Sequence, residues 1–523
     1  MNRSTFFIWT IVGLSLLFGF IVGRSPHWNQ SSDVSSGSEK VNQFLQYLDR
    51  YYVEAIDTDS LATDVIQAMI EKLDPHSFYI PPEELEHINE NLQGNFVGIG
   101  INFFMINDTI NVIRVLDQGP SKKAGIQSGD RILIANRDTL YGKNLTSEAV
   151  VQRLRGKEKS EVTLTVYRPS SKQLKQIEVT RAPVPIFSVI HYKIAPKTGY
   201  IKINRFAETT NQEFQRAVAD LKAKGMKKMI LDLRDNPGGF MQAAEQIADT
   251  FLTEGQIIVT VETHQGEKEI TLAKSGGQFE TGVVYVLLNG ESASASEVVA
   301  GALQDNDRAW LLGQRSFGKG LVQQQMPLGK NEAIRLTTAR YYTPTGRSIQ
   351  RPYGKGNEAY FNDVFQRQET GEIADEEKIP YNDSLVFTTP KGRTVYGGGG
   401  IVPDIYVRIN ESTEEQWENY LLRSNLMNHF VFIELDKHRA EYAAEERSSF
   451  INTPLQRKEK WLKALTIYLN ENAVPLSAPN EELAAVNIKA YLALQLFDET
   501  AQRAVLNRQD IFIQEALRKL ETQ

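Results

Sequence analysis

The first part of the chain changes from a helical to a β-type hydrophobic pattern near Gly94. Apolar residues recur at helical spacing in FLQYLDRYYVEAI and LATDVIQAMIEKLDP, and Pro82 can open a further helix after SFYIP. From Gly94 onward, short β-branched runs between turn residues predict strands, with one helix at SEAVVQRLRG. We expect a small helical cap followed by a compact strand-rich unit that ends near Arg181.

The remainder of the chain alternates strands with helices and then becomes helical. Strands are predicted at TGYIKINRF, KKMILDLRDNPGGF, GQIIVTVETH and VVYVLLN, with helices at NQEFQRAVADLKAKG and MQAAEQIADTFL. This alternation predicts an α/β layer with crossover connections, although the short apolar runs also allow antiparallel pairs. The helical pattern after Val407 opens with a capping box at Ser412–Glu415. It predicts a helical extension that either dimerises or positions substrate, or only packs on the rest and stabilises it.

Length and composition exclude some functions. A chain of 523 residues, 41% hydrophobic and 24% charged, can bury several cores, about three at roughly 150 residues per domain. The net charge of −7 and the absence of a basic block argue against a nucleic-acid partner. With no cysteine, the chain has no thiol nucleophile, zinc–thiolate site or iron–sulfur cluster.

Neither a metal nor a cofactor is expected. No HExxH motif occurs, and Asp305-x-Asp307 lacks the later glycine and glutamate of a calcium loop. That acidic pair is interpreted as a solvated helix end.

An apolar segment lies near the N-terminus. Phe6–Gly23 is uncharged between Arg3 and Arg24, and as a helix it would rise roughly 27 Å, about the thickness of a bilayer core. A cleaved signal peptide is the alternative, but no clear small-x-small cleavage site follows. An uncleaved anchor is favoured, with the N-terminus cytoplasmic and everything after Arg24 exported.

Candidate chemistry lies between Val283 and Gln325. The strand VVYVLLN feeds a helix through the Ser-rich turn GESASASE, which places hydroxyls where free backbone N–H groups favour negative charge. The strand ILDLRD likewise ends at Asn236-Pro237-Gly238-Gly239. In open α/β sheets, ligands bind beyond the strand ends, so the two turns are expected to face one pocket.

Sequence spacing leaves the general base open. A Ser-His-Asp triad can be assembled from distant segments, although the nearest histidines are His264 and His429. Lys319, between two glycines, could act as a neutral base in a buried pocket; alternatively it is a surface loop lysine. Ser316 to Lys319 also fits S-x-x-K, but the glycines disfavour the helix that this pairing needs, and no S-D-N or K-T-G element is present.

The strand-rich unit resembles a PDZ domain. The similarity rests on the loop Gly98-Ile99-Gly100-Ile101, on the stretch GPSKKAGIQSGD and on the later helix ending in LRG. Glycines let backbone N–H groups converge on the terminal carboxylate of a peptide that adds as a strand. His76 and Arg155 are interpreted as structural or solvated and receive no role.

A larger region, from about Asn42 to Val407, resembles the carboxy-terminal processing proteases, also called tail-specific proteases. The similarity is carried by LDPHSFYI, GIGI, DLRDNPGG, SASASEVVAGALQDNDRAWLLGQRSFGKGLVQ, RLTTARYYTPTGRSIQ and GGGGIVPDI, which occur in the order of that family. The resemblance implies that Ser294 is the nucleophile, Lys319 the general base and Gln323 the residue that positions the lysine. It also implies an oxyanion hole from the backbone N–H groups of Ser294 and of Gly238 or Gly239.

The expected fold is a multidomain α/β chain: a membrane anchor (1–24), a linker (25–37), a helical cap (38–93), a PDZ domain (94–181), a serine-protease core (182–410) and a helical C-terminal domain (411–523). The expected function is an exported, membrane-anchored serine endopeptidase of the cell envelope, periplasmic in a Gram-negative cell. Its partners would be proteins or peptides with free, apolar C-termini, and the C-terminal helices could form a homo-oligomer. The alternative is a membrane-tethered PDZ scaffold on an inactive protease fold.

Overall fold

The computed structural model describes residues 36–329, 331–410, 412–474 and 480–522. They form two compact units that divide between Leu73 and Asp74.

The described residues of the first unit form two helices. These are α2 (Ser36–Tyr51) and α3 (Thr58–Ile70), as the hydrophobic spacing predicts. Asp57 caps α3 by accepting the N–H groups of Asp59 and Ser60. Within the described residues, no helix is long and apolar enough to cross a bilayer. The segment Phe6–Gly23 lies outside the described residues, so the anchor stays a prediction.

The second unit begins with β1 (Phe78–Ile80) and α4 (Pro82–Gln93). Pro82 stands in the first turn of α4, where its missing N–H costs nothing, and this prediction is confirmed. Arg155 forms two hydrogen bonds of 2.8 Å with the carboxylate of Glu90 on α4. Arg155 therefore ties the strand-rich unit to this helix.

The strand-rich unit folds as an antiparallel sheet in the order β3-β4-β5-β7-β8, with β6 paired to β5. Its core contains Ile99, Ile132, Val150 and Val166, so both sheet and helices contribute. Its elements are β2 (Asn95–Gly98), β3 (Ile101–Ile106), β4 (Thr109–Val115), α5 (Pro120–Ala124), β5 (Arg131–Ala135), β6 (Asp138–Thr139), α6 (Ser147–Leu154), β7 (Glu161–Arg168), β8 (Gln173–Thr180) and β9 (Ala182–Pro185).

The centre of the second unit is a six-stranded sheet in the order β10-β11-β12-β15-β16-β21. Only β10 runs antiparallel to its neighbour, and the other strand pairs are parallel. The predicted α/β layer is therefore confirmed, and it includes one of the antiparallel pairs that the sequence allows. The strands are β10 (Val189–Ala195), β11 (Thr198–Ile203), β12 (Lys228–Asp232), β15 (Val283–Leu288), β16 (Trp310–Gly313) and β21 (Ile405–Tyr406).

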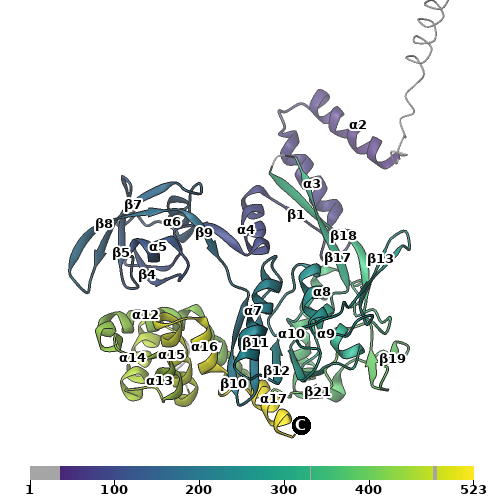
Figure 1. Ribbon diagram of the computed structural model, residues 1–523. Helices are drawn as coiled ribbons and strands as arrows, with labels where there is room; N and C mark the ends of the chain where they lie inside the picture. The colour runs from purple at the N-terminus through teal and green to yellow at the C-terminus, as the bar shows by residue number, and fades with distance from the viewer. Residues whose placement is uncertain (1–35, 330, 411, 475–479, 523) are drawn as a thin grey trace, which may run out of the picture. The chain divides into compact units, whose positions relative to one another are not determined.

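Helices cover both faces of this sheet. Three of them, α7 (Thr210–Ala223), α8 (Met241–Asp249) and α9 (Ala295–Asp305), pack on alternate strand residues such as Leu231 and Val286. The intervening residues, such as Ile230 and Leu287, pack instead against the C-terminal helix α17 (Ile511–Glu521). Because both faces are buried, the strands read as nearly continuous apolar runs. Figure 1 shows α17, in yellow, beside β11 and β12.

A second, antiparallel sheet lies beside the first layer in the order β1-β18-β13-β14, with β17 paired to β18. Its additional strands are β13 (Ile257–Thr263), β14 (Lys268–Leu272), β17 (Leu321–Leu328) and β18 (Glu332–Tyr342). Residues 343 to 410 add α10 (Asn357–Glu369), η1 (Glu372–Ala374), η2 (Glu376–Lys378), β19 (Val386–Thr388) and β20 (Thr394–Tyr396).

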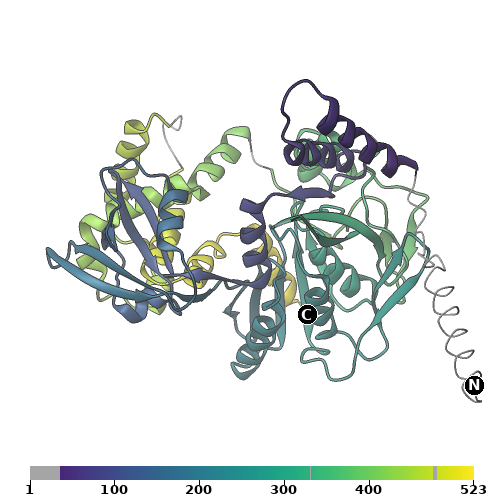
Figure 2. The same cartoon turned by 90° about the horizontal axis from the view of Figure 1, so that it is seen from above.

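The helical extension is confirmed after Thr413, and the capping box of Ser412 and Glu415 is present in both directions. One of its helices, α12 (Asn425–His438), packs on the strand-rich unit, where Arg131 pairs with Asp436 and Phe104 contacts His429 at 5.2 Å between ring centroids. Figures 1 and 2 both show this neighbourhood. The helices are α11 (Thr413–Arg423), α12 (Asn425–His438), η3 (Arg439–Tyr442), α13 (Arg447–Asn452), α14 (Lys458–Glu471), α15 (Glu481–Leu496), α16 (Glu499–Leu506) and α17.

Candidate active site

The site is built where four adjacent parallel strands end. Arg205 follows β11, the Gly238–Gly239 turn follows β12, Ser294 follows β15 and Lys319 follows β16. All of them line one cavity of about 410 Å³. The prediction that the two strand-end turns face one pocket is confirmed, and the position agrees with the rule that ligands bind beyond the carboxyl ends of parallel strands.

Ser294 stands at the N-terminus of α9 in an unusual backbone conformation. Its φ is 53° and its ψ is −111°, a region that residues with a Cβ rarely occupy. Such strain persists only where the surroundings enforce it, and it is frequent at reactive residues. The sharp turn presents the Ser294 side chain to the cavity, in the field of the helix N-terminus.

The buried carboxylate of Glu297 holds this turn in place. One oxygen accepts the backbone N–H groups of Ser294 (2.8 Å) and Lys319 (2.9 Å). The other accepts the Gly318 N–H at 2.7 Å and the hydroxyl of Ser316 at 2.5 Å. Burial raises the pKa of Glu297, and the four donors oppose that rise. One side chain therefore fixes the backbones of both candidate catalytic residues.

Lys319 points its amine into a hydrogen bond with Gln323. The Nζ atom donates to Oε1 of Gln323 at 2.7 Å, and Nε2 of Gln323 donates to the backbone carbonyl of His76. The amide therefore has a fixed orientation with its oxygen toward the lysine. Burial, assisted by the nearby cation of Arg335, lowers the pKa of Lys319 to about 8, whereas Glu297 and Asp74 oppose this shift. Near pH 8 about half of such a lysine is neutral.

The segment that supports Gln323 is held by Asp74. Its carboxylate accepts the N–H groups of His76 and Ser77, the Ser77 hydroxyl at 2.6 Å, and the Thr337 hydroxyl at 3.0 Å. The His76 ring lies 2.9 Å from the hydroxyl of Tyr360 and is buried. Burial, with the charge of Lys319, lowers the pKa of His76 to about 3, so the ring is neutral.

Gly238 and Gly239 approach the nucleophile too closely for any side chain. A Cβ on Gly238 would lie 2.9 Å from the Ser294 Cβ, and one on Gly239 would lie 2.1 Å from the carbonyl oxygen of Phe206. Both glycines have positive φ, at 103° and 140°. This part of the turn is therefore restricted to glycine.

The backbone donors near Ser294 differ in availability. The Gly238 N–H donates to Oδ1 of Asn236 and the Ser294 N–H to Glu297, whereas the N–H groups of Gly239 and Ala295 have no hydrogen-bond partner among the described residues. To donate to an oxyanion, the backbone N–H of Ser294 would first have to break its hydrogen bond with Glu297. The oxyanion role of Ser294, Gly238 and Gly239 stays a prediction, and Ala295 is a donor that sequence reasoning missed.

The alternative pairings have less support from the geometry. No histidine lines the cavity among the described residues. Ser316 is fully buried, and its hydroxyl donates to Glu297 in a segment that is not helical. The S-x-x-K helix is therefore absent, as its glycines predict.

The candidate peptide-binding loop joins β2 to the edge strand β3. Gly98 ends β2, Ile99 packs in the core, Gly100 has a φ of 77°, and Ile101 begins β3. In the described sheet β3 has a partner on one side only, which is the arrangement that strand addition needs. The binding role of these four residues stays a prediction.

The interpretation of Asp305 and Asp307 as a solvated helix end is wrong. Asp305 is buried and pairs with the buried Arg347 at 2.7 Å, and Asp307 pairs with Arg393 at 2.7 Å. Both arginines come from segments later in the chain, which the local sequence does not reveal.

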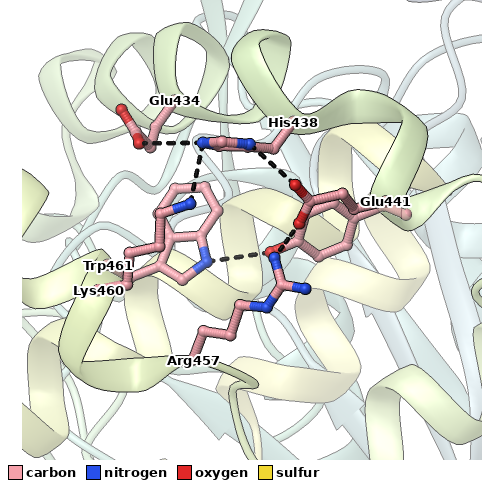
Figure 3. Close-up of a pocket in the computed structure, with 7 residues that line it drawn as sticks. Glu434, His438, Glu441, Arg457, Lys460 and Trp461 are labelled. Carbon is pink, nitrogen blue, oxygen red and sulfur yellow. Dashed lines mark hydrogen bonds and ion pairs between the residues drawn. The ribbon is translucent and has the colours of Figure 1, made fainter.

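A second cavity lies among α12, η3 and α14, where His438 contacts Glu441 at 3.0 Å and Lys460 at 2.9 Å (Figure 3). Its volume of about 10 Å³ leaves room for about one water molecule. This cavity is too small for a substrate, and its polar residues join the helices that surround it.

Comparisons with known proteins define the class of this protein. Residues 197–356 match Peptidase family S41, and residues 97–180 match the PDZ domain. Over 348 residues the chain is 36% identical to a carboxy-terminal-processing protease of Bartonella bacilliformis, covering 66% of this chain and 80% of the relative. It is also 31% identical over 324 residues to the carboxy-terminal processing protease CtpB of Bacillus subtilis, with 61% and 67% covered.

Among solved structures, the photosystem II D1 C-terminal processing protease matches at 25% identity and a TM-score of 0.38, covering 71% of this chain and 87% of that protein. The two matched domains make the chain a PDZ-containing peptidase. With the relatives above, it belongs to the carboxy-terminal processing proteases of Peptidase family S41, which are serine-type peptidases. This confirms the family resemblance found in the sequence.

Proposed function

We propose that this protein cleaves protein substrates near their C-termini through a dyad of Ser294 and Lys319. The observation that carries the proposal is that both side chains line one cavity, with the amine of Lys319 largely desolvated and bound to Gln323. The structure has no hydrogen bond between the Ser294 hydroxyl and the Lys319 amine. The reaction therefore requires a side-chain movement that brings them together.

The proposed reaction is acyl transfer. Neutral Lys319 accepts the Ser294 proton, and the oxygen attacks the peptide carbonyl. The oxyanion is stabilised by backbone N–H groups of the Gly238–Gly239 turn and of the start of α9, as preorganised donors require. The lysine then gives its proton to the leaving amine, and water releases the acyl group. Gln323 acts on the lysine by orienting it.

The PDZ domain would bind the substrate C-terminus at Gly98–Ile101, with the peptide added to the free edge of β3. Export and anchoring through Phe6–Gly23 are part of the same proposal and rest on the sequence pattern. Homo-oligomerisation through the C-terminal helices stays a prediction, as does the absence of a cofactor.

The test is turnover by the purified full-length chain of a peptide with an apolar, free C-terminus. Cleavage that disappears in the Ser294→Ala and Lys319→Ala variants, without loss of the folded structure, would support the dyad. Peptide binding with no turnover by the wild-type protein would instead favour the inactive PDZ scaffold.

A further inference from the structure

The catalytic cavity carries positive charge without a matching carboxylate. Its charged lining residues are Arg205, Lys319 and Arg335, and no Asp or Glu lines it in the described part of the chain. The dyad explains Lys319, but neither arginine has a part in the proposed reaction. Neither arginine lies within ion-pair distance of a carboxylate in the described structure, although Glu213 and Glu499 act on the charge of Arg205 from a greater distance.

Arg205 is placed by the end of β11. One of its terminal nitrogens, Nη2, donates to the carbonyl of Ile186 at 2.5 Å. Its Nε atom is buried and has no hydrogen-bond partner in the described structure. Nε lies on the same edge of the guanidinium group as Nη2, so this edge is held by the protein, and Nη1, which has no hydrogen-bond partner among the described residues, is the donor left for a ligand.

Arg335 reaches the cavity from the second sheet. Its Cζ atom lies 5.3 Å from the centre of the Phe78 ring, and Nη2 donates to Oε1 of Gln325 at 3.0 Å. Stacking on an aromatic face orients a guanidinium plane and leaves its edge donors free. Burial lowers the pKa of both arginines, which reflects the water that each has lost, although both remain protonated.

Partly buried cations with unused donors are costly unless a counter-charge binds. The matching ligand is a carboxylate, since a guanidinium donates to it in a bidentate manner. Apolar side chains such as Phe240, Met241 and Val298 line the rest of the cavity. The cavity therefore suits a peptide that carries an apolar residue close to an anionic group.

We propose that Arg205 and Arg335 bind a carboxylate of the peptide substrate and so select which bond reaches Ser294. This inference rests on the proposed function. The carboxylate has two sources, an Asp or Glu side chain near the cleaved bond or the free C-terminus of a short peptide. Because the Arg335 cation lowers the pKa of Lys319, a carboxylate bound to Arg335 would raise that pKa again and favour the protonated lysine.

The experiment compares matched peptides cleaved by the full-length protein. A first set is amidated at the C-terminus and carries Glu at successive positions around the cleaved bond, each with a Gln partner. A second pair is the neutral peptide with a free or an amidated C-terminus. The ratio of kcat/KM within each pair is taken on the high-pH plateau of the pH profile, where Lys319 is neutral whatever the peptide or the variant does to its pKa.

In at least one pair, we expect the wild-type protein to cleave the carboxylate member with a kcat/KM about tenfold higher or more. This is the size of effect expected from a hydrogen bond to a charged group. The variants Arg205→Gln and Arg335→Gln should each bring that ratio close to one. The matched control is Arg216→Gln, an exposed arginine on α7 outside the cavity, which should keep the wild-type ratio. The pair whose kcat/KM ratio falls in the arginine variants identifies the source of the carboxylate. An effect of amidation that arises at the PDZ domain is recognised because it persists in these variants.

Ratios near one in every wild-type pair, with the neutral peptides cleaved, would overturn the inference and leave the proposed function intact. If every preference of the wild type survives in both arginine variants, the inference is overturned as well. If no peptide is cleaved, the proposed function fails, and the same peptides are then titrated against the Ser294→Ala protein. An affinity for the carboxylate members that depends on Arg205 and Arg335 would still support the inference, whereas equal affinities would refute it.

Discussion

The backbone N–H of Ser294 donates to the carboxylate of Glu297 at 2.8 Å, across the first turn of α9. The same oxygen accepts the N–H of Lys319 at 2.9 Å. Two segments that are 25 residues apart in sequence are therefore held by one buried side chain. Any loss of this carboxylate should disturb both the turn of the nucleophile and the loop of the base.

Glu297→Gln should lower both activity and stability. The amide keeps one acceptor oxygen and turns its NH₂ toward backbone donors, so at least one buried N–H loses its partner. Leaving buried donors unsatisfied costs about 1–3 kcal/mol each. We expect a loss of about 2–4 kcal/mol in the free energy of unfolding and about a hundredfold loss in kcat, measured by urea denaturation and peptide cleavage. Glu291→Gln, at an exposed position of the same turn, is the control and should change neither quantity.

Ser294→Ala and Lys319→Ala should each abolish peptide cleavage and keep the fold. The nucleophile and its base act as a pair, so removing either one abolishes most of the catalysis. In comparable serine peptidases kcat falls about a millionfold. The measurement is turnover of a peptide with a free C-terminus, with circular dichroism to check folding. Ser316→Ala separates the two serines, because it should retain measurable turnover if Ser294 is the nucleophile. Activity that survives in Ser294→Ala would contradict the dyad.

Gln323→Glu should move the pH dependence of catalysis to higher pH. If neutral Lys319 is the base, kcat/KM rises with pH through the lysine pKa of about 8. The charges that face Lys319 are Arg335, which lowers its pKa, and Glu297 and Asp74, which raise it, while His76 is neutral. A carboxylate in place of the Gln323 amide favours the protonated lysine, so the rising limb should shift upward by about one pH unit or more.

The matched control for this shift is Gln324→Glu, which adds the same charge on the exposed side of β17. Its pH profile of kcat/KM should stay within a few tenths of a unit of the wild type, because solvent screens an exposed charge. A downward shift in Gln323→Glu, or equal shifts in both variants, would exclude Lys319 as the titrating base.

The sequence predicts the strand-end turns well because their chemistry is local. Ser294 and the glycines after β12 are read from a strand followed by turn residues, and the parallel sheet then brings the turns together. Glu297 also has a local signal, since Ser294-x-x-Glu297 has the spacing of a capping box. The anchoring of Gln323 by the His76 carbonyl has none, because the two residues meet only after β1 pairs with β18.

The partners of buried charged residues are the hardest feature to predict from the sequence. Asp305 and Asp307 look solvated beside a polar helix end, yet their partners Arg347 and Arg393 come from distant loops. The same holds for α17, whose N-cap residue Asp510 accepts a hydrogen bond from Arg234, just after the end of β12, at 2.9 Å. The helical period predicts that α17 forms, but it does not predict which surface of the sheet α17 covers.

Gly239→Ala should impair both the packing of the Gly238–Gly239 turn and its proposed role in binding the oxyanion. The new Cβ would lie 2.1 Å from the Phe206 carbonyl oxygen at a φ of 140°, so the turn must shift. Displacing one oxyanion donor typically costs about a hundred- to a thousandfold in kcat. The control is Gly255→Ala, where φ is 83° and the surroundings are open, so that only backbone strain of about 1 kcal/mol is added. Equal and small effects of the two substitutions on kcat would remove the Gly239 turn from the catalytic site.

His76 should make the protein sensitive to acid. Its pKa is about 3 in the folded protein against 6.5 in the unfolded chain, so the unfolded chain binds the additional proton between these values. The free energy of unfolding therefore falls as the pH drops below 6.5, by about 1.4 kcal/mol per pH unit from this group. Between pH 7 and pH 5 the wild type should lose about 2 kcal/mol more than His76→Gln, measured by urea denaturation at each pH. His87→Gln, at an exposed histidine, should keep the wild-type slope, and a slope that His76→Gln leaves unchanged would show that His76 takes up its proton without unfolding.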